Sequence, residues 1–304
     1  MKNKCILKCV LFALVAFNSL AIMAQTTQQA AKPEKKFLQP ERVRYDGSCM
    51  TIEGKDIFIY SAAFHYFRCP EELWRDRFRQ IKEAGFNTVE TYVPWNWHER
   101  IMPSGLNDNS HFDFSDVKRW LKMAQEEFGL YTIVRPGPFI CAEYSGGGYP
   151  RWLAKFCPGG MDDFWLRSAD HRHISWSQHW FDAVCKALAD EQITRKPVGE
   201  KGIILIQIEN EYNHHGCYGK EKLLKALYQS VRKSGMDIPI FTCLTNECRS
   251  SEDVELSQVF DSDNYYVGLS SAPDCAYRMA NLRKEQPDAP GFVTELQGGW
   301  FSLV

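Results

Sequence analysis

The stretch at residues 202–212, GIILIQIENEY, constrains the fold more than any other part of the 304-residue chain. Its apolar run at 203–206 is rich in β-branched side chains and does not alternate with polar ones. Such a run predicts a strand that is buried on both faces, as in parallel sheets. Glu209, Asn210 and Glu211 follow at its C-terminal end, which is where (β/α)8 barrels carry their active sites. We therefore interpret Glu211 as a candidate catalytic carboxylate.

Predicted strands and helices alternate along the rest of the chain. A β-hairpin is expected first at 37–58, and core strands at 56–64, 88–95, 130–135, 202–212, 239–244, 259–267 and 291–295. Helices are expected between them at 70–84, 115–128, 175–192, 220–234 and 273–285. Ser115 is the expected cap of the second helix, and Tyr277 and Leu282 are expected on the inner face of the last. Seven such units predict an α/β fold with parallel strands, a (β/α)8 TIM barrel.

The two ends of the chain set its expected organisation. No eighth strand is predicted before Val304, so we expect a barrel that is incomplete at its C-terminus, in a fragment of a longer protein. The alternative is an open seven-stranded sheet that is complete as it stands. At the N-terminus, three lysines precede an apolar run that is too short and interrupted to span a membrane well. We predict a signal peptide at 1–24, a flexible lead-in at 25–38 and a truncated barrel domain at 39–304, in a protein exported to the periplasm or secreted.

Composition narrows the classes of ligand. The net charge of −2 gives no electrostatic reason to expect a nucleic acid or an anionic membrane as a partner. The 9 Trp, 13 Tyr and 19 Phe chiefly indicate a large core, and their rings mildly favour a carbohydrate ligand. The 11 Cys include no CxxC pair and no zinc spacing. Cys243 and Cys248, the nearest pair after the signal, could form a disulfide.

Two other features could suggest a metal or a phosphate, and we interpret both in structural terms. His65 and His98 follow different strands, where lone histidines more often serve as hydrogen-bonding groups than as metal ligands. The three glycines at 146–148 lack the Lys and the helix start of a phosphate-binding loop, so they indicate a plain turn. We therefore expect no metal and no cofactor.

Glu211 has a possible partner in Glu295, at the end of the last predicted strand. In a barrel these two strands, the fourth and the seventh, face each other across the mouth. Glycoside hydrolysis needs such a pair, because one carboxyl protonates the leaving oxygen while the other attacks or stabilises the anomeric carbon. Glu209 faces the same side as Glu211 if the strand continues through both. We expect Glu209 to lie deeper, held by hydrogen bonds in a supporting role.

Five motifs together carry a family resemblance. They are QIENEY, TYVPWNWHE, FDFS, LYTIVRPGPFICAEY and GGYPRWL. These motifs closely resemble those of glycoside hydrolase family 35, the β-galactosidases, and the similarity runs from about residue 42 to residue 300. The resemblance implies a (β/α)8 barrel that is usually followed by β-sandwich domains. It also implies a carbohydrate substrate, because the family hydrolyses terminal β-linked galactose with retention of configuration.

The resemblance also assigns roles to individual residues. It makes Glu211 the acid/base and Glu295 the nucleophile. It implies that the sugar is contacted by Tyr92, Cys141, Ala142, Glu143 and Asn210. Two positions depart from the family pattern: Tyr144 stands where a Trp usually closes the CAEW motif, and Leu296-Gln297 stands where many members carry an aromatic residue.

The mechanism implied is a two-step retaining hydrolysis, for which the two carboxyl groups should lie about 5–5.5 Å apart. Two alternatives remain open at this point. One is a related barrel glycosidase that acts on another β-linked sugar, such as a glucosaminide or an arabinopyranoside. The other is a carbohydrate-binding protein that has lost catalysis, against which the presence of both carboxylates argues.

Overall fold

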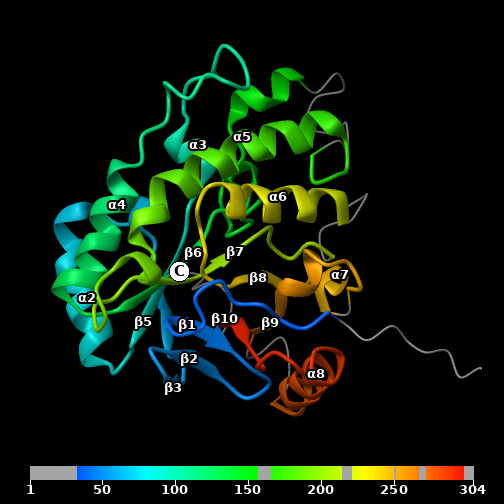
Figure 1. Cartoon of the computed structure of the whole chain (residues 1–304). Helices are drawn as coiled ribbons and strands as arrows, with labels where there is room; N and C mark the ends of the chain where they lie inside the picture. Colours follow the sequence, from blue (N-terminus) through cyan, green and yellow to red (C-terminus); the bar gives the residue numbers. More distant parts are fainter. Residues whose placement is uncertain (1–32, 157–165, 214–220, 250, 267–271, 298–304) are drawn as a thin grey trace, which may run out of the picture. The chain divides into compact units, whose positions relative to one another are not determined.

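A seven-stranded parallel sheet forms the centre of the fold (Figure 1). The computed structural model describes residues 33–156, 166–213, 221–249, 251–266 and 272–297. The order of strands in the sheet is β10-β9-β8-β7-β6-β5-β4, and each neighbouring pair is parallel. The strands are β4 (Ser61–Ala63), β5 (Thr88–Tyr92), β6 (Tyr131–Arg135), β7 (Ile203–Gln207), β8 (Ile240–Cys243), β9 (Phe260–Tyr266) and β10 (Val293–Gln297).

The sheet has the topology of a barrel. Its order follows the sequence without reversal, and right-handed crossovers then place every connecting helix on the same face. The opposite face can be covered only if the sheet curls on itself. Tyr92 on β5 donates a hydrogen bond to Glu295 on β10, near the opposite end of the order, which requires this curl. The predicted (β/α)8 barrel fold is therefore confirmed, with seven strands among the described residues.

The helices cover the outer side of the strands, and α5 and α6 lie side by side (Figure 1). They are α2 (Glu71–Glu83), α3 (Trp95–His98), α4 (Ser115–Lys122), α5 (His171–Leu188), α6 (Glu221–Lys233), α7 (Asn246–Arg249) and α8 (Ala272–Glu285). A π-helical turn, η2 (Met123–Glu127), continues α4. The short 3-10 turns are η1 (Tyr66–Arg68), η3 (Ser145–Gly148), η4 (Arg151–Phe156), η6 (Ala189–Glu191), η7 (Ile193–Arg195) and η8 (Leu256–Gln258). Within the described residues, no helix is both long enough and apolar enough to cross a membrane.

A small antiparallel sheet replaces the expected hairpin. It consists of β1 (Val43–Tyr45), β2 (Met50–Ile52) and β3 (Lys55–Ile57). The strand expected at 56–64 is wrong, because it divides into β3, which pairs antiparallel with β2, and β4, which pairs parallel with β5. The ring of Tyr45 packs 4.7 Å from that of Phe260, where β9 begins. The small sheet therefore lies against the N-terminal end of β9, away from the C-terminal ends of the strands.

Three local predictions need correction. Ser115 does not cap α4; it is the first helical residue, and its backbone N–H donates to the Asp113 carboxylate at 2.9 Å. Helix α5 begins at residue 171, ahead of the expected 175, because Asp170 caps it by accepting from the backbone N–H of Arg172. On α8, Leu282 is buried as expected, but Tyr277 is 68% exposed and is not part of the core.

Most of the predicted N-terminal domain boundaries lie outside the residues that the structure describes. The signal at 1–24 and most of the lead-in at 25–38 lie outside the described residues. Within the last residues of the lead-in, Lys35 Nζ donates to the carbonyls of Ser257 and Val259 at 2.7 and 3.0 Å. The ring of Phe37 also packs 4.8 Å from that of Tyr45. Contacts with the barrel domain therefore begin ahead of residue 39.

Candidate active site

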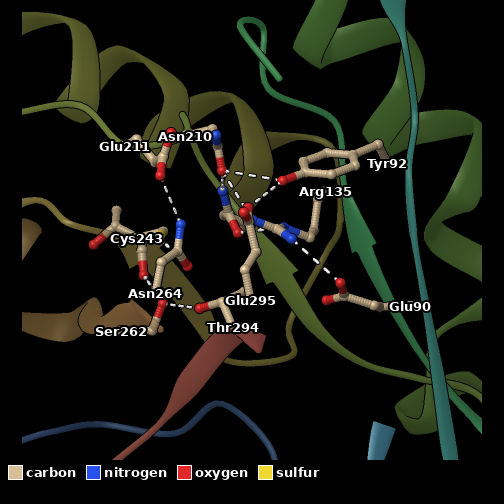
Figure 2. Close-up of polar contacts among 12 residues, drawn as sticks. Glu90, Tyr92, Arg135, Asn210, Glu211, Cys243, Ser262, Asn264, Thr294 and Glu295 are labelled. Atoms are coloured by element: carbon tan, nitrogen blue, oxygen red, sulfur yellow. Dashed lines mark hydrogen bonds and ion pairs between the residues drawn. The ribbon is translucent and has the colours of Figure 1, made fainter. Parts of the chain in front are cut away.

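Glu295 lies on β10 and receives three hydrogen bonds at its carboxylate (Figure 2). Arg135 donates to Oε1 at 2.7 Å, and the Tyr92 hydroxyl donates to the same oxygen. The Tyr266 hydroxyl donates to Oε2 at 2.5 Å. These partners come from β5, β6 and β9, so the curl of the sheet assembles the arrangement.

Arg135 is the cation at the centre of this cluster. It ends β6, is fully buried, and lies 4.1 Å from the centroid of the Tyr92 ring. Besides Glu295, it donates to Gln207 Oε1 at 2.7 Å, to Asn210 Oδ1 at 2.8 Å and to Glu90 Oε1 at 3.3 Å. A buried guanidinium needs this many acceptors, since an unpaired buried charge is strongly unfavourable. Its position next to Glu295 is thereby fixed.

The same guanidinium affects two carboxyl groups differently. For Glu295, burial would raise the pKa, but the charge of Arg135 and hydrogen bonds from Tyr266 and Tyr92 outweigh burial and lower it. For Glu90, burial outweighs the attraction of Arg135 and raises the pKa to about 7. Hydrogen bonds donated to a carboxylate favour its ionised form, and Glu295 has more of them. Glu295 is therefore the ionised carboxylate of the cluster at neutral pH.

Glu211 lies on an irregular segment rather than on a strand. Strand β7 ends at Gln207, and the φ angles of Glu209 and Glu211 are +56° and +47°, in the left-handed region. The prediction that a strand runs from 202 to 212 is therefore wrong at its end, and the alternation of side chains does not apply to these two residues. Glu211 is 7% exposed and accepts a hydrogen bond from Asn264 Nδ2 at 2.8 Å (Figure 2).

Glu209 holds this segment in place through a buried ion pair. Its carboxylate is fully buried and pairs with Arg167, at 2.6 Å through Nη2 and 3.1 Å through Nε. Arg167 Nη2 also donates to the carbonyl of Asn210 at 2.7 Å, and its guanidinium lies 3.9 Å from the centroid of the Phe139 ring. Glu209 is thus buried and hydrogen-bonded, as the sequence predicted, and it holds the backbone that carries Glu211.

The two candidate catalytic carboxylates are joined by a short chain of polar groups. Asn264 Nδ2 donates to Glu211 and also to the Tyr266 hydroxyl, at 3.4 Å. Tyr266 in turn donates to Glu295. Both carboxylates therefore belong to one hydrogen-bonded site at the C-terminal ends of β7, β9 and β10.

Cys141, Ala142 and Glu143 form a left-handed turn after β6, with φ angles of +53°, +52° and +46°. The Ala142 carbonyl accepts a hydrogen bond from Arg68. Burial first, and the charges of Glu211 and Glu295 in addition, raise the pKa of the Cys141 thiol. The turn therefore lies within electrostatic range of both candidate catalytic carboxylates, and Glu143 is exposed there.

Asn210 presents an unused donor to the same site. Its Oδ1 accepts from Arg135 and from Gln207 Nε2 at 2.9 Å, and it lies 3.5 Å from the Tyr92 hydroxyl oxygen. Its Nδ2 is buried and has no hydrogen-bond partner among the described residues. A buried donor without a partner costs about 1–3 kcal/mol, so the amide is suited to a ligand oxygen.

The histidines, cysteines and glycines noted in the sequence are held by hydrogen bonds or by packing within the fold. His98 contacts the Tyr66 hydroxyl at 2.6 Å and the Asp113 carbonyl at 2.5 Å through its two ring nitrogens. His65 Nδ1 lies 3.4 Å from Thr91 Oγ1. Cys243 and Cys248 are free thiols, so the disulfide is not formed. At the 146–148 turn, a side chain at Gly147 would collide with the Phe139 ring.

Sequence reasoning gave no role to three members of the site. They are Arg135, Asn264 and Tyr266. Arg135 had a signal, because it is the one charge in the apolar strand LYTIVR. Strand β9 had another: it reads FDSDNYY, and residues 261–264 are all polar yet at most 4% exposed. A polar run inside a predicted core strand indicates side chains that serve a site.

Comparison with known proteins places this geometry in context. The sequence profile of the glycosyl hydrolases family 35 matches residues 49–303. Beta-galactosidase-1-like protein 3 of Rattus norvegicus is 36% identical over 292 residues, covering 94% of this chain and 42% of the rat protein. A beta-galactosidase of Xanthomonas manihotis is 32% identical over 260 residues, covering 84% of this chain and 39% of its own length. The chain thus spans less than half the length of these relatives.

A solved structure gives an independent view of the fold. The crystal structure of a beta-mannanase from Streptomyces thermolilacinus matches with a TM-score of 0.50 and 13% sequence identity. The match covers 84% of this chain and 75% of the mannanase. At this level of identity the likeness supports the barrel fold alone.

Proposed function

The chain belongs to glycosyl hydrolases family 35, and from that premise we propose that it releases terminal β-linked galactose from oligo- or polysaccharides with retention of configuration. Glu295 is the nucleophile and Glu211 the acid/base. The observation that carries the proposal is the contrast between the two carboxylates. Glu295 is held ionised by one guanidinium and two phenol hydroxyls, whereas Glu211 accepts the amide of Asn264 and lies on the segment after β7.

The first step forms a covalent intermediate. An oxygen of Glu295 attacks the anomeric carbon as the glycosidic bond breaks, and Glu211 gives its proton to the departing oxygen. Arg135 and the two tyrosines keep Glu295 deprotonated and aimed, which a nucleophile requires. In the second step Glu211 takes a proton from water, and the resulting hydroxide displaces Glu295 from the sugar.

Substrate recognition falls to groups around the pair. Asn210 Nδ2, the buried donor that has no hydrogen-bond partner within the described part of the chain, is proposed to bind a sugar hydroxyl. Cys141, Ala142 and Glu143 form the turn after β6, where the charges of both carboxylates raise the pKa of the Cys141 thiol, and Tyr92 contacts Glu295 directly. Gln297 lies two residues beyond Glu295 on β10, so it shares the face of Glu295 where the family often has an aromatic ring. This position makes sugar preference the part of the proposal that most needs measurement.

The test uses the full-length protein and a panel of nitrophenyl glycosides. We expect the β-galactoside to be hydrolysed faster than the β-glucosaminide and the arabinopyranoside. Incubation with a 2-deoxy-2-fluoro-galactoside, followed by peptide mass spectrometry, should find the label on Glu295. Faster turnover of another sugar would assign that specificity instead, and binding of galactosides without turnover would favour a carbohydrate-binding protein. Export through the N-terminal segment stays a prediction.

A further inference from the structure

A buried thiol lies directly behind the hydrogen-bonded chain that links the two carboxylates. Cys243 ends β8 and is fully buried, and its Sγ donates to Asn264 Oδ1 at 3.0 Å. Strands β8 and β9 are parallel neighbours in which Cys243 pairs with Ser262. Asn264 lies two residues further along β9, on the same face as Ser262, so the sheet register brings the thiol and the amide together.

The orientation of the Asn264 amide determines what Glu211 meets. In the observed orientation, Nδ2 uses its two hydrogens on Glu211 and Tyr266. If the amide turned over, Oδ1 would face the carboxylate of Glu211, and two acceptors would oppose each other. The amide oxygen therefore needs a donor on the far side of the residue, and the thiol supplies it (Figure 2).

We propose that Cys243 is a positioning residue for the proton donor: its thiol fixes the Asn264 amide, and the amide in turn holds Glu211 in place. The inference rests on the proposed role of Glu211 as acid/base. Burial raises the pKa of the Cys243 thiol well above its ordinary value, so the thiol keeps the proton that it donates. A cysteine in this place is thus a hydrogen-bond donor and not a nucleophile.

The test relies on how much a leaving group needs a proton. A dinitrophenyl galactoside departs without acid assistance, whereas a phenyl galactoside depends on it, and kcat/KM reports only the first step. Removing the donor with Cys243→Ala should lower kcat/KM for the phenyl galactoside about tenfold, the rate equivalent of one hydrogen bond. The dinitrophenyl galactoside should change by less than about twofold, since acid assistance contributes little to its departure.

Three further variants of buried cysteines make the result specific. Cys243→Val fills the space without a donor and should behave like Cys243→Ala, which covers the case in which the alanine variant folds poorly. Cys243→Ser keeps a donor and should restore most of the activity on the phenyl galactoside. Cys185→Ala removes another fully buried thiol, on α5, and should not change the ratio of the two substrates.

Glu211→Ala separates failure of this inference from failure of the proposed function. In Glu211→Ala, kcat/KM for the phenyl galactoside should fall by about 100-fold or more, while kcat/KM for the dinitrophenyl galactoside should change much less. If Glu211→Ala lacks this dependence on the leaving group, the acid/base role is wrong. Where Glu211→Ala shows this dependence, the positioning role is overturned if Cys243→Ala and Cys243→Val lower kcat/KM equally for both substrates, or for neither. A Cys243→Ser variant that does not restore activity on the phenyl galactoside would overturn it as well.

Discussion

The two candidate catalytic carboxylates are held by opposite means. Glu295 is part of a regular strand, β10, and its oxygens are bound by Arg135, Tyr92 and Tyr266. Glu211 belongs to a segment of left-handed backbone after β7, and the amide of Asn264 binds it. Within the one site, Glu295 is thus paired directly with a buried cation. Glu211 instead depends on a segment whose backbone is held by Arg167.

This difference fits the two roles. A nucleophile must stay ionised and in line with one carbon, which a rigid strand and fixed donors provide. An acid/base must release a proton and take one back within a single cycle, so a neutral amide is a better partner for it than a guanidinium. The comparison therefore predicts that perturbing each side changes a different part of the kinetics.

The largest effect is expected at Glu295 itself. Glu295→Gln removes the attacking oxygen but keeps the size of the side chain and an acceptor for Arg135. We expect turnover of a nitrophenyl galactoside to fall by about 10⁴-fold or more, as for loss of other catalytic nucleophiles. Undiminished turnover in a folded variant would remove Glu295 from the mechanism.

The next effect tests the cation. Arg135→Met should raise the pKa of Glu295, because the charge and the hydrogen bond that lower it are gone. In the proposed mechanism Glu295 acts in its ionised form, so activity should be lost as the pH falls through its pKa. The acidic limb of the kcat/KM profile should therefore move to higher pH, with activity near neutrality lower by about 100-fold or more. An acidic limb that does not move would show that Arg135 does not set the charge of Glu295.

A third prediction concerns stability and the second carboxyl on the same guanidinium. The pKa of Glu90 is raised from 4.5 to about 7, so between these values the folded protein keeps a proton that the unfolded chain has released. Stability therefore falls as the pH rises through this window, by on the order of 3 kcal/mol. Urea unfolding of Glu90→Gln and the unchanged protein at pH 4.5 and 7.5 should show this loss only in the unchanged protein. An equal pH dependence in both would contradict the assignment.

The smallest effect is expected on the Glu211 side. Arg167→Met breaks the ion pair with Glu209 and the hydrogen bond to the Asn210 carbonyl. We expect kcat to fall about tenfold because Glu211 is less well placed, while the acidic limb of the pH profile stays where it is. A shift of that limb as large as the one in Arg135→Met would show that the two sides are not separate.

Much of the fold could be predicted because it follows from local patterns. Continuous apolar runs such as IILI indicate buried parallel strands, and their regular alternation with amphipathic helices leaves few topologies. The details that failed depend on distant partners. The expected strand at 56–64 divides because β2 and β5 pair with its two halves. The end of β7 was misplaced because the left-handed backbone at Glu209 is not visible in residue type.

The site could be predicted in part, for the same physical reason. Glu211 and Glu295 became candidates because each closes a strand that the sequence predicts, where the fold places functional groups. In the structure Glu211 lies beyond the end of β7 and Glu295 lies within β10, yet both reach the same hydrogen-bonded cluster. Arg135, Asn264 and Tyr266 lie on strands that only the curl of the sheet brings to Glu295 and Glu211. Residue order carries no information on such contacts until the curvature is known.

The stereochemistry of azide rescue tests the division of roles most directly. In Glu211→Ala, azide should displace Glu295 from the covalent intermediate and give the β-galactosyl azide. In Glu295→Gly, azide should attack the substrate from the opposite face, with Glu211 protonating the leaving group, and give the α-galactosyl azide. Proton NMR of the products distinguishes the two anomers. An α product from Glu211→Ala with a β product from Glu295→Gly would contradict the account, because it would exchange the roles of the two carboxylates.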